Sequence, residues 1–195
     1  MPDMPEEIYA SGKMFELVHT TQPDGRVFET ARRAPGVRIL IADQKQQKLL
    51  LTREFRRELN AYDYRLPGGK VFDSLAEFEA FRHTNTDIMA PAASKAKAEA
   101  REEAGMIIDD VQFFKKSTLG ATVEWDLYVF EATQYRVSQS GQALEAGEQI
   151  DEAVWYGFDE VEHMILRGNM QEERIALITL QWLTEARRRS RLETV

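Results

Sequence analysis

Two segments decide the fold of this chain: LPGGK at residues 66–70 and AKAEAREEAGM at residues 96–106. The second segment predicts the end of a helix, because Ala, Lys, Arg and Glu favour helices and Gly105 suits the left-handed conformation that ends one. On this helix Glu99 and Glu103 lie one turn apart, and Glu102 lies beside them. Three carboxylates this close repel one another unless a positive charge lies among them. A hard divalent cation with oxygen ligands, Mg²⁺ above all, would supply that charge.

The plainer interpretation of these glutamates is a solvated helix face. The Pro-Gly-Gly-Lys turn favours a site, because the two segments together resemble the Nudix box. That box is a loop–helix–loop with the pattern G-x5-E-x7-R-E-U-x-E-E-x-G-U, where U is aliphatic, and it holds Mg²⁺ (or Mn²⁺) for hydrolysis of nucleoside diphosphate derivatives. The residues that match its pattern are Gly69, Glu99, Glu102, Glu103, Gly105 and Met106.

The chain departs from the family pattern in two ways. The two pattern glycines stand 36 positions apart, which is 15 more than in the family, so the box contains an insertion. The first pattern Glu falls on Leu75 and the pattern Arg on Ala98, so both members of the pair that braces the loop are missing and neither charge is left unpaired. Glu77 or Glu79, inside the insertion, could restore the brace. We therefore expect a modified box that still binds metal.

Length and composition indicate one ordinary globular domain. The chain has 195 residues, 43% of them hydrophobic and 30% charged, and we expect a flexible arm at 1–13 and a single domain at 14–195. A net charge of −8 argues against binding nucleic acid through a basic surface. No apolar run is long enough for a membrane and no signal-peptide pattern is present, so we expect a cytoplasmic protein. The absence of cysteine excludes disulfides, thiolate catalysis and zinc–thiolate sites.

Alternating and helical patterns predict the order of the elements. The expected strands are 14–22 and 26–33, which form a hairpin, and then 37–42, 48–52, 111–119, 125–132 and 153–158. The expected helices are 74–83 inside the insertion, the box helix from about Pro91, a short helix capped by Asp159 and ending near Arg167, and 171–192. The side chains expected on the inner face of the last helix are Ile175, Leu177, Ile178, Trp182 and Leu183. Residues 134–149 are expected to form a mobile loop.

This order of elements suits an α/β/α sandwich around a mixed sheet, with an extra N-terminal β-hairpin. The same architecture is typical of Nudix proteins. The resemblance covers roughly residues 14–185 and is greatest for the ADP-ribose and nucleotide-sugar pyrophosphatase branch. The features that match this branch are the hairpin at 14–33, the pair Phe55-Arg56, Glu124, and the helix IALITLQWL at 175–183.

The resemblance implies the roles of the site residues. Gly68 would offer its main-chain carbonyl to the metal, Glu99 and Glu103 would be metal ligands, and Glu102 would serve close by in metal binding and catalysis. Arg56 would contact the diphosphate or the terminal sugar, although a surface salt bridge is the plainer role. The hairpin would be exchanged within a homodimer, completing each site from two chains.

The substrate side of the resemblance is less close. The branch often carries Arg-Glu where this chain has Phe28-Glu29. The Phe28 ring could stack on a base, but we favour a place in the core, so ADP-ribose itself is not assured. Phe28, Glu29, Arg56 and Glu124 remain the candidate substrate-binding residues.

The expected reaction is metal-assisted attack of water on one phosphorus of a diphosphate, which releases a nucleoside monophosphate and a phosphorylated partner. A carboxylate must accept the proton from the water. The branch takes this base from the loop between the late strands, where Glu148 best matches its acidic-x-Ile pattern and Glu145 is the reserve. A solvated acidic loop is the alternative.

Two other functions remain open at this point. A Nudix-like sensor could keep the fold and bind a nucleotide sugar without turnover, which the insertion and the loss of the box Arg favour. The three retained glutamates argue against it, because a pure binder does not need them. A nucleoside triphosphate pyrophosphohydrolase is a third possibility, although such enzymes usually lack the N-terminal hairpin.

Overall fold

The structure is a computed structural model that describes residues 5–84, 86–144 and 149–192. The strands are β1 (Glu6–Ser11), β2 (Glu16–Thr21), β3 (Val27–Arg32), β4 (Gly36–Leu40), β5 (Ala42–Asp43), β6 (Lys48–Arg56), β7 (Ala61–Arg65), β8 (Met106–Ser117), β9 (Val123–Glu124), β10 (Leu127–Val137) and β11 (Val154–Gly157). The helices are α1 (Leu75–Arg82), α2 (Met89–Ala104), α3 (Phe158–Leu166) and α4 (Glu173–Leu192). None of the helices in the described part of the chain is long and apolar enough to span a membrane.

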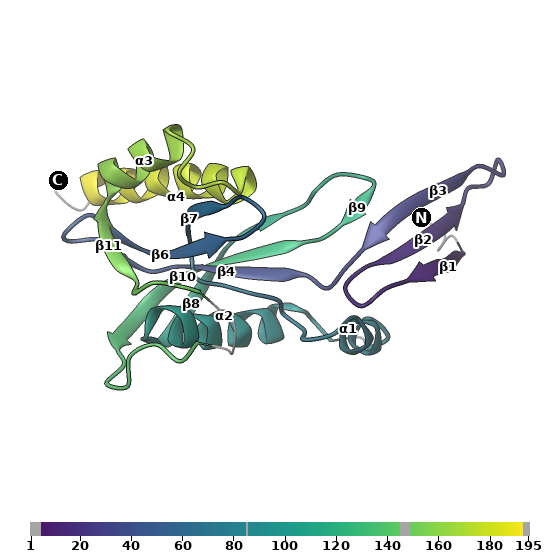
Figure 1. Ribbon diagram of the computed structural model, residues 1–195, viewed down its shortest axis with the longest axis horizontal. Coiled ribbons are helices and arrows are strands. Elements are labelled where there is room, and N and C mark those ends of the chain that lie inside the picture. The colour runs from purple at the N-terminus through teal and green to yellow at the C-terminus, as the bar shows by residue number, and fades with distance from the viewer. Residues whose placement is uncertain (1–4, 85, 145–148, 193–195) are drawn as a thin grey trace.

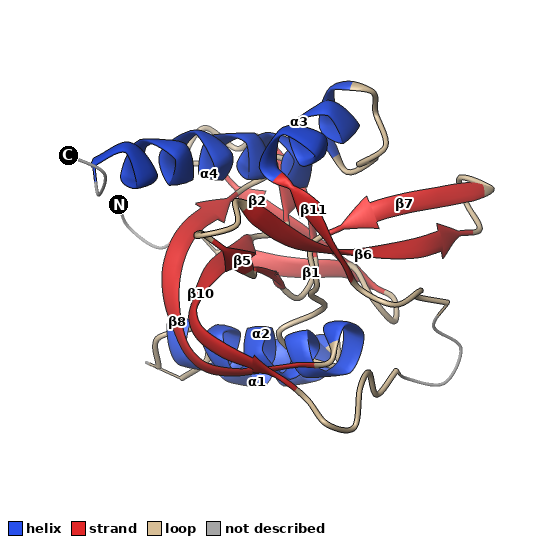
Figure 2. Ribbon diagram, turned by 90° about the vertical axis from the view of Figure 1, so that its left-hand side faces the viewer, coloured by secondary structure: helices blue, strands red, loops and turns tan. Residues whose placement is uncertain are grey.

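The strands of the main domain lie between two layers of helices. One sheet has the order β4-β10-β8, with β4 parallel and β8 antiparallel to β10, and a second has the order β11-β6-β5, with β7 also paired to β6. Helices α3 and α4 cover one side of these sheets and α2 covers the other (Figures 1 and 2). The predicted α/β/α sandwich with mixed strand directions is confirmed.

Strand β4 divides the core into two halves. Val37 and Ile39 are fully buried against the α2 layer, where Ala96 allows the helix to approach closely. Leu40 points to the opposite side and packs in the cluster that contains Trp182 of α4. Adjacent residues of a strand face opposite sides of the sheet, so a continuous apolar strand is what a position between two helical layers requires.

The N-terminal sheet extends away from the sandwich, with strand order β1-β2-β3-β9 (Figure 1). Arg32, only 3% exposed, holds it together through ion pairs with Glu6 (2.6 Å), Glu16 (3.2 Å) and Glu124 (2.7 Å). Three carboxylates share its guanidinium, which has five N–H donors. The predicted hairpin is present as β2 and β3. Residues 6–11, however, form strand β1 where we expected a flexible arm.

Several predicted boundaries need correction. Strand β7 was not predicted, and β10 continues to Val137, into the segment expected to be a mobile loop. Asp159 lies in the first turn of α3, whose N-cap is Gly157. Leu177, expected on the inner face of α4, is 57% exposed. The helix within the insertion is confirmed as α1, and Ser74 caps it as predicted by accepting a hydrogen bond from the N–H of Glu77.

Candidate functional site

The Pro-Gly-Gly turn is held as an extended segment beside β4. The N–H of Ile39 donates to the carbonyl of Pro67 and the N–H of Val37 donates to the carbonyl of Gly69, each at 2.9 Å. In an extended segment the residue between two such positions faces the other way. The N–H of Gly68 therefore points away from β4 and donates to Glu103 Oε2 of α2 at 2.8 Å.

Both glycines of the turn make close contacts. Gly68 has a φ of 153°, and a Cβ there would stand 2.1 Å from the carbonyl oxygen of Val37. A Cβ on Gly69 would stand 2.1 Å from Glu99 Oε1. Gly68 is required, because its Cβ would clash with the backbone of β4, whereas a side chain at Gly69 would displace the Glu99 carboxylate from the loop.

Helix α2 presents its glutamates to this loop. It ends at Gly105 in the predicted left-handed conformation, with φ at 63°. Glu99 is only 7% exposed and faces Gly69, whereas the Glu102 side chain is 32% exposed and does not line the cleft. The cation among the carboxylates is Lys95, whose Nζ lies 3.1 Å from Glu99 and 3.9 Å from Glu102.

The buried carboxylate and its lysine shift each other's titration. Burial raises the pKa of Glu99, and the ammonium of Lys95 only partly offsets this effect. Burial lowers the pKa of Lys95, but the charges of Glu99 and Glu102 outweigh it, so the net shift is upward. Each partner therefore favours the charged form of the other.

The loop and the helix form one wall of a cleft with a volume of about 360 Å³. Its cationic lining residues are Arg33, Arg38, Arg56, Arg65, Lys70 and Lys95, and its acidic ones are Glu54, Asp73, Glu99 and Glu103. The protein as a whole has a net charge of −8. A concentration of cations in one cleft of an acidic protein indicates an anionic ligand.

The carboxylate and main-chain oxygens at the box loop are of the kind that binds a hard divalent cation, although they are not arranged around a metal position in this structure. Among the described residues, no group of three or more His, Asp or Glu side chains is arranged to hold a metal ion. Glu99 and Glu103 nevertheless place two carboxylates at the box loop, and carboxylate and main-chain oxygens are the ligands that Mg²⁺ prefers. Lys95 lies against Glu99 and would have to move aside for the metal.

Arg56 lies in the cleft, as its implied role requires, and it is also paired. Its guanidinium contacts Glu54 at 3.0 Å and Glu58 at 2.5 Å. Both interpretations of this residue, substrate contact and salt bridge, are therefore compatible with its position.

The other candidate substrate residues lie outside the cleft of the single chain. Phe28 is 47% exposed on β3, so the interpretation of Phe28 as a core residue is wrong for this chain. Glu29 pairs with His19 at 3.2 Å, and Glu124 pairs with Arg32 on the N-terminal sheet.

The candidate bases Glu148 and Glu145 lie outside the described residues. The chain that follows them is anchored to β6: the N–H of Phe55 donates to the carbonyl of Gln149 at 3.2 Å, and the N–H of Asp151 donates to the carbonyl of Arg53 at 2.8 Å. Ile150, between these two anchors, lines the cleft.

The insertion borders the cleft with its first residues, while α1 turns toward the N-terminal sheet. Leu75 and Phe78 pack on Ala34, and Arg82 lies 3.5 Å from Glu6. A cavity of about 220 Å³ beside Leu75 shares some of its lining residues with the cleft, namely Met14, Arg33, Lys70 and Asp73.

Neither glutamate of the insertion braces the box loop. Glu77 accepts a hydrogen bond from the N–H of Asp73 at the start of α1, and Glu79 pairs with Arg82 within the helix. The loop is instead held by its hydrogen bonds to β4 and by the bond from Gly68 to Glu103.

Sequence reasoning missed several residues of the cleft. Arg38 interrupts the apolar run of β4, and that interruption was the available signal. Arg33 stacks on Trp125, with its Cζ 4.2 Å from the ring centroid, and Arg174 lies 4.4 Å from the same ring. These contacts join residues far apart in sequence, so no local sequence pattern predicts them.

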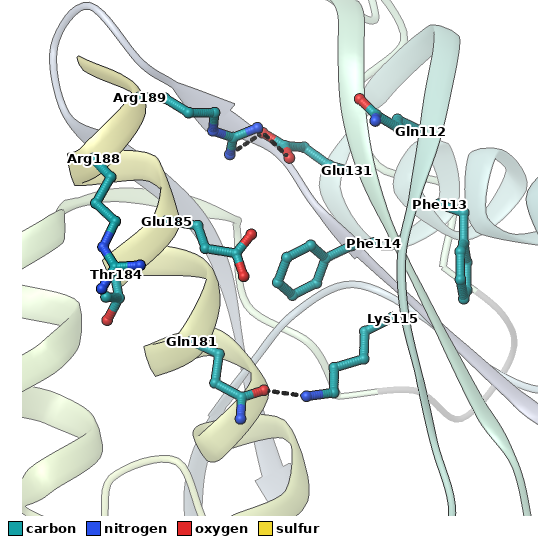
Figure 3. Close-up of a pocket in the computed structure, with 10 residues that line it drawn as sticks. All are labelled: Gln112, Phe113, Phe114, Lys115, Glu131, Gln181, Thr184, Glu185, Arg188 and Arg189. Carbon is teal, nitrogen blue, oxygen red and sulfur yellow. Dashed lines mark hydrogen bonds and ion pairs between the residues drawn. The ribbon is translucent and has the colours of Figure 1, made fainter. Parts of the chain in front are cut away.

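A larger cavity, about 710 Å³, lies between β8 and α4 (Figure 3). Glu131 is bound there by Arg189, and Lys115 donates to Gln181. None of the box residues lines this cavity, so we place the candidate site in the smaller cleft.

Comparison with known proteins shows a likeness of fold. No protein-family model and no curated protein sequence matches the chain. A solved structure described as "Crystal structure of ADP compounds hydrolase" matches 93% of this chain and 92% of its own, with a TM-score of 0.64 and 17% sequence identity. At this identity the likeness is one of fold alone.

Proposed function

We propose that the cleft hydrolyses a nucleoside diphosphate linked to another group, giving a nucleoside monophosphate and a phosphorylated product. One observation carries this proposal. The structure brings the Pro-Gly-Gly turn within hydrogen-bonding distance of a helix whose Glu99 and Glu103 face it, although an insertion separates the two segments in sequence. A solvated helix face would not have a glycine packed directly against one of its carboxylates, as Gly69 is against Glu99.

The electrostatics of the cleft support a substrate with several negative charges. Arginine side chains come from β4, β6 and β7, and lysine side chains from the box loop and α2. Planar guanidinium groups match the oxygens of phosphate, and Arg forms bidentate pairs with them. Such a cleft would bind a diphosphate and place it beside Glu99 and Glu103.

Mg²⁺ would be held by Glu99, Glu103 and the main chain at Gly68, with Mn²⁺ as an alternative and Glu102 in reserve on the same helix. When bound, it would neutralise the diphosphate and acidify the attacking water. The chain's own residues then have two tasks: the arginines orient the diphosphate, and a carboxylate takes the proton from water. We assign this second task to Glu148, with Glu145 as the reserve, because the residues after Glu148 are anchored at the edge of the cleft.

The substrate class we propose is an ADP-ribose or nucleotide-sugar type compound. The solved structure of similar fold is described as an ADP compounds hydrolase, which agrees with the branch that the sequence resembles. In the single chain Phe28, Glu29 and Glu124 lie on the N-terminal sheet, outside the cleft. We propose that they reach a substrate only in a homodimer, where the sheet of one chain extends over the cleft of its partner.

The test is a panel of ADP-ribose, ADP-glucose, GDP-mannose, UDP-glucose, NADH and nucleoside triphosphates, each assayed with Mg²⁺ and with Mn²⁺. We expect nucleoside monophosphate from at least one diphosphate derivative, at a kcat/KM at least tenfold above that for any triphosphate. A panel in which only triphosphates are hydrolysed would contradict the proposed substrate class.

A sensor without turnover is the second candidate, and one observation favours it. Lys95 already neutralises Glu99, as the ammonium of a pure binding protein would. The two functions differ in a single experiment. A sensor binds a nucleotide sugar with unchanged affinity in EDTA and never forms product, whereas the enzyme forms product only with metal.

A further inference from the structure

Arg38 occupies an uncommon position for an arginine. It lies on β4 between the fully buried Val37 and Ile39, and it is only 8% exposed, yet its side chain lines the cleft. It runs directly beside the box loop, since a Cβ on Gly68 would stand 2.9 Å from Arg38 Cδ. The loop and the arginine therefore share one wall of the site.

The charge of Arg38 is poorly compensated by the protein. One of its terminal nitrogens donates to the carbonyl of Val37 at 3.2 Å, the other lies 3.8 Å from Glu172, and Nε has no hydrogen-bond partner among the described residues. Glu172 is shared, because Arg65 lies 3.2 Å and Arg174 3.4 Å from it.

A buried cation whose ion pair is long and shared costs stability, and such a position suits an arginine that receives further counter-charge from a ligand. Arg65 shows the contrast, because it is bound by Glu54 at 2.8 Å and by Glu172 at 3.2 Å. Arg56, the arginine implied by family resemblance, is likewise paired with two carboxylates. Among the arginines of the cleft wall, Arg38 thus combines deep burial with an unused donor.

We propose that Arg38 is a substrate-binding residue that holds a phosphoryl oxygen of the diphosphate against the box loop. This inference rests on the proposed function and adds to it a binding residue on β4. The ligand chemistry is that of a diphosphate group, whose oxygens can accept from Nε and from a terminal nitrogen together. Such a ligand would give Arg38 the counter-charge that Glu172, already shared with two other arginines, supplies only weakly.

The test measures binding of inorganic pyrophosphate by isothermal titration calorimetry in EDTA, so that neither metal nor turnover is involved. The variants are Arg38→Met, which keeps most of the length of the side chain without its charge, and Arg38→Lys, which keeps the charge without the planar guanidinium and its paired N–H donors. The matched control is Arg189→Met, which removes an arginine paired with Glu131 far from the cleft. Melting temperatures are measured without ligand for every variant.

We expect Arg38→Met to weaken pyrophosphate binding at least tenfold and Arg38→Lys to weaken it by a smaller factor, while Arg189→Met binds as the wild type does. We also expect the ligand-free melting temperature of Arg38→Met to equal or exceed that of the wild type, because Glu172 keeps Arg65 and Arg174. The proposal is overturned if Arg38→Met binds pyrophosphate within twofold of the wild type, or if the wild type binds none. Loss of stability in both Arg38 variants with unchanged affinity would assign Arg38 a purely structural role.

The same variants separate this inference from the proposed function. If the wild type hydrolyses a diphosphate derivative and Arg38→Met leaves the KM unchanged, the proposed hydrolase function is supported and the substrate-binding role of Arg38 is contradicted. If pyrophosphate binding depends on Arg38 but no compound of the panel is hydrolysed, the binding role of Arg38 is supported and the proposed hydrolase function is contradicted.

Discussion

Glu103 joins the box loop to α2, and its two roles can be separated by one substitution. Its carboxylate accepts a hydrogen bond from the N–H of Gly68, and a glutamine would retain an oxygen for that bond. We predict that Glu103→Gln lowers kcat by on the order of a hundredfold or more, a few kcal/mol in barrier. Its melting temperature without metal should change little. Turnover like that of the wild type would remove Glu103 from the metal site.

Glu99 gives a prediction in which removal of the charge stabilises the protein. Burial raises its pKa above the usual value of 4.5. The folded state therefore disfavours the ionised form: the cost in stability is absent well below pH 4.5, grows as the pH rises from 4.5 toward the folded pKa, and is complete above that pKa. Glu99→Gln should thus raise the melting temperature in EDTA at pH 7 and leave it nearly unchanged at pH 4.

Glu102→Gln is the matched control for this experiment, since Glu102 is on the same helix, contacts the same lysine and is more exposed. We expect a smaller change in its melting temperature at pH 7. A Glu99→Gln protein less stable than the wild type at pH 7 in EDTA would contradict the stated cost of the buried carboxylate.

At the scale of elements, α1 secures the insertion to the N-terminal sheet. Phe78 is buried with Leu75 and Ala34, in a small cluster separate from the two main cores. We predict that Phe78→Ala lowers the free energy of unfolding by about 3 kcal/mol, which corresponds to a fall of roughly 6–12 °C in melting temperature. The control is Phe113→Ala, because Phe113 is 42% exposed on β8; equal losses in the two variants would show that α1 contributes no specific packing.

Sequence patterns predicted several elements whose side chains enter a core. The box helix and the helix within the insertion carry spaced apolar residues that are buried, and β4 carries a continuous apolar run apart from Arg38. Strand β1 has no such repeat, because all of its residues are exposed and it is held by backbone pairing to β2 and by Glu6. Patterns of burial cannot reveal a strand of that kind.

The residues of the cleft that belong to the family motif could be predicted from the sequence, and those that belong to no motif were missed. The matched motif placed Gly68, Glu99 and Glu103 together. Arg38 reaches the same cleft only through the pairing of β4 with the box loop, and Lys95 shows that the cation among the carboxylates can be a side chain of the same helix. The contact of Arg38 with the box loop depends on the fold, whereas Lys95 and Glu99 are an i,i+4 pair whose spacing was available in the sequence.

For the whole molecule, we predict a homodimer formed through the N-terminal sheet. Large apolar side chains are exposed there, among them Ile8 (53%), Tyr9 (66%) and Val27 (56%), and exposed apolar groups on one small sheet are typical of an interface. Sedimentation should give twice the monomer mass at micromolar concentration, and Val27→Asp should shift it to monomer. Leu166→Asp is the control, since Leu166 is 71% exposed on α3; a monomeric wild type would contradict the interface.

The measurement that tests the hydrolase most directly follows phosphorus NMR signals of a diphosphate derivative from the panel, first in EDTA and then after addition of excess Mg²⁺. We predict no change in EDTA and, after Mg²⁺, equal amounts of nucleoside monophosphate and phosphorylated partner, because the glutamates at the box loop require the metal to activate water. Equal rates with and without Mg²⁺, or no product from any diphosphate derivative, would contradict a metal-dependent diphosphate hydrolase in this cleft.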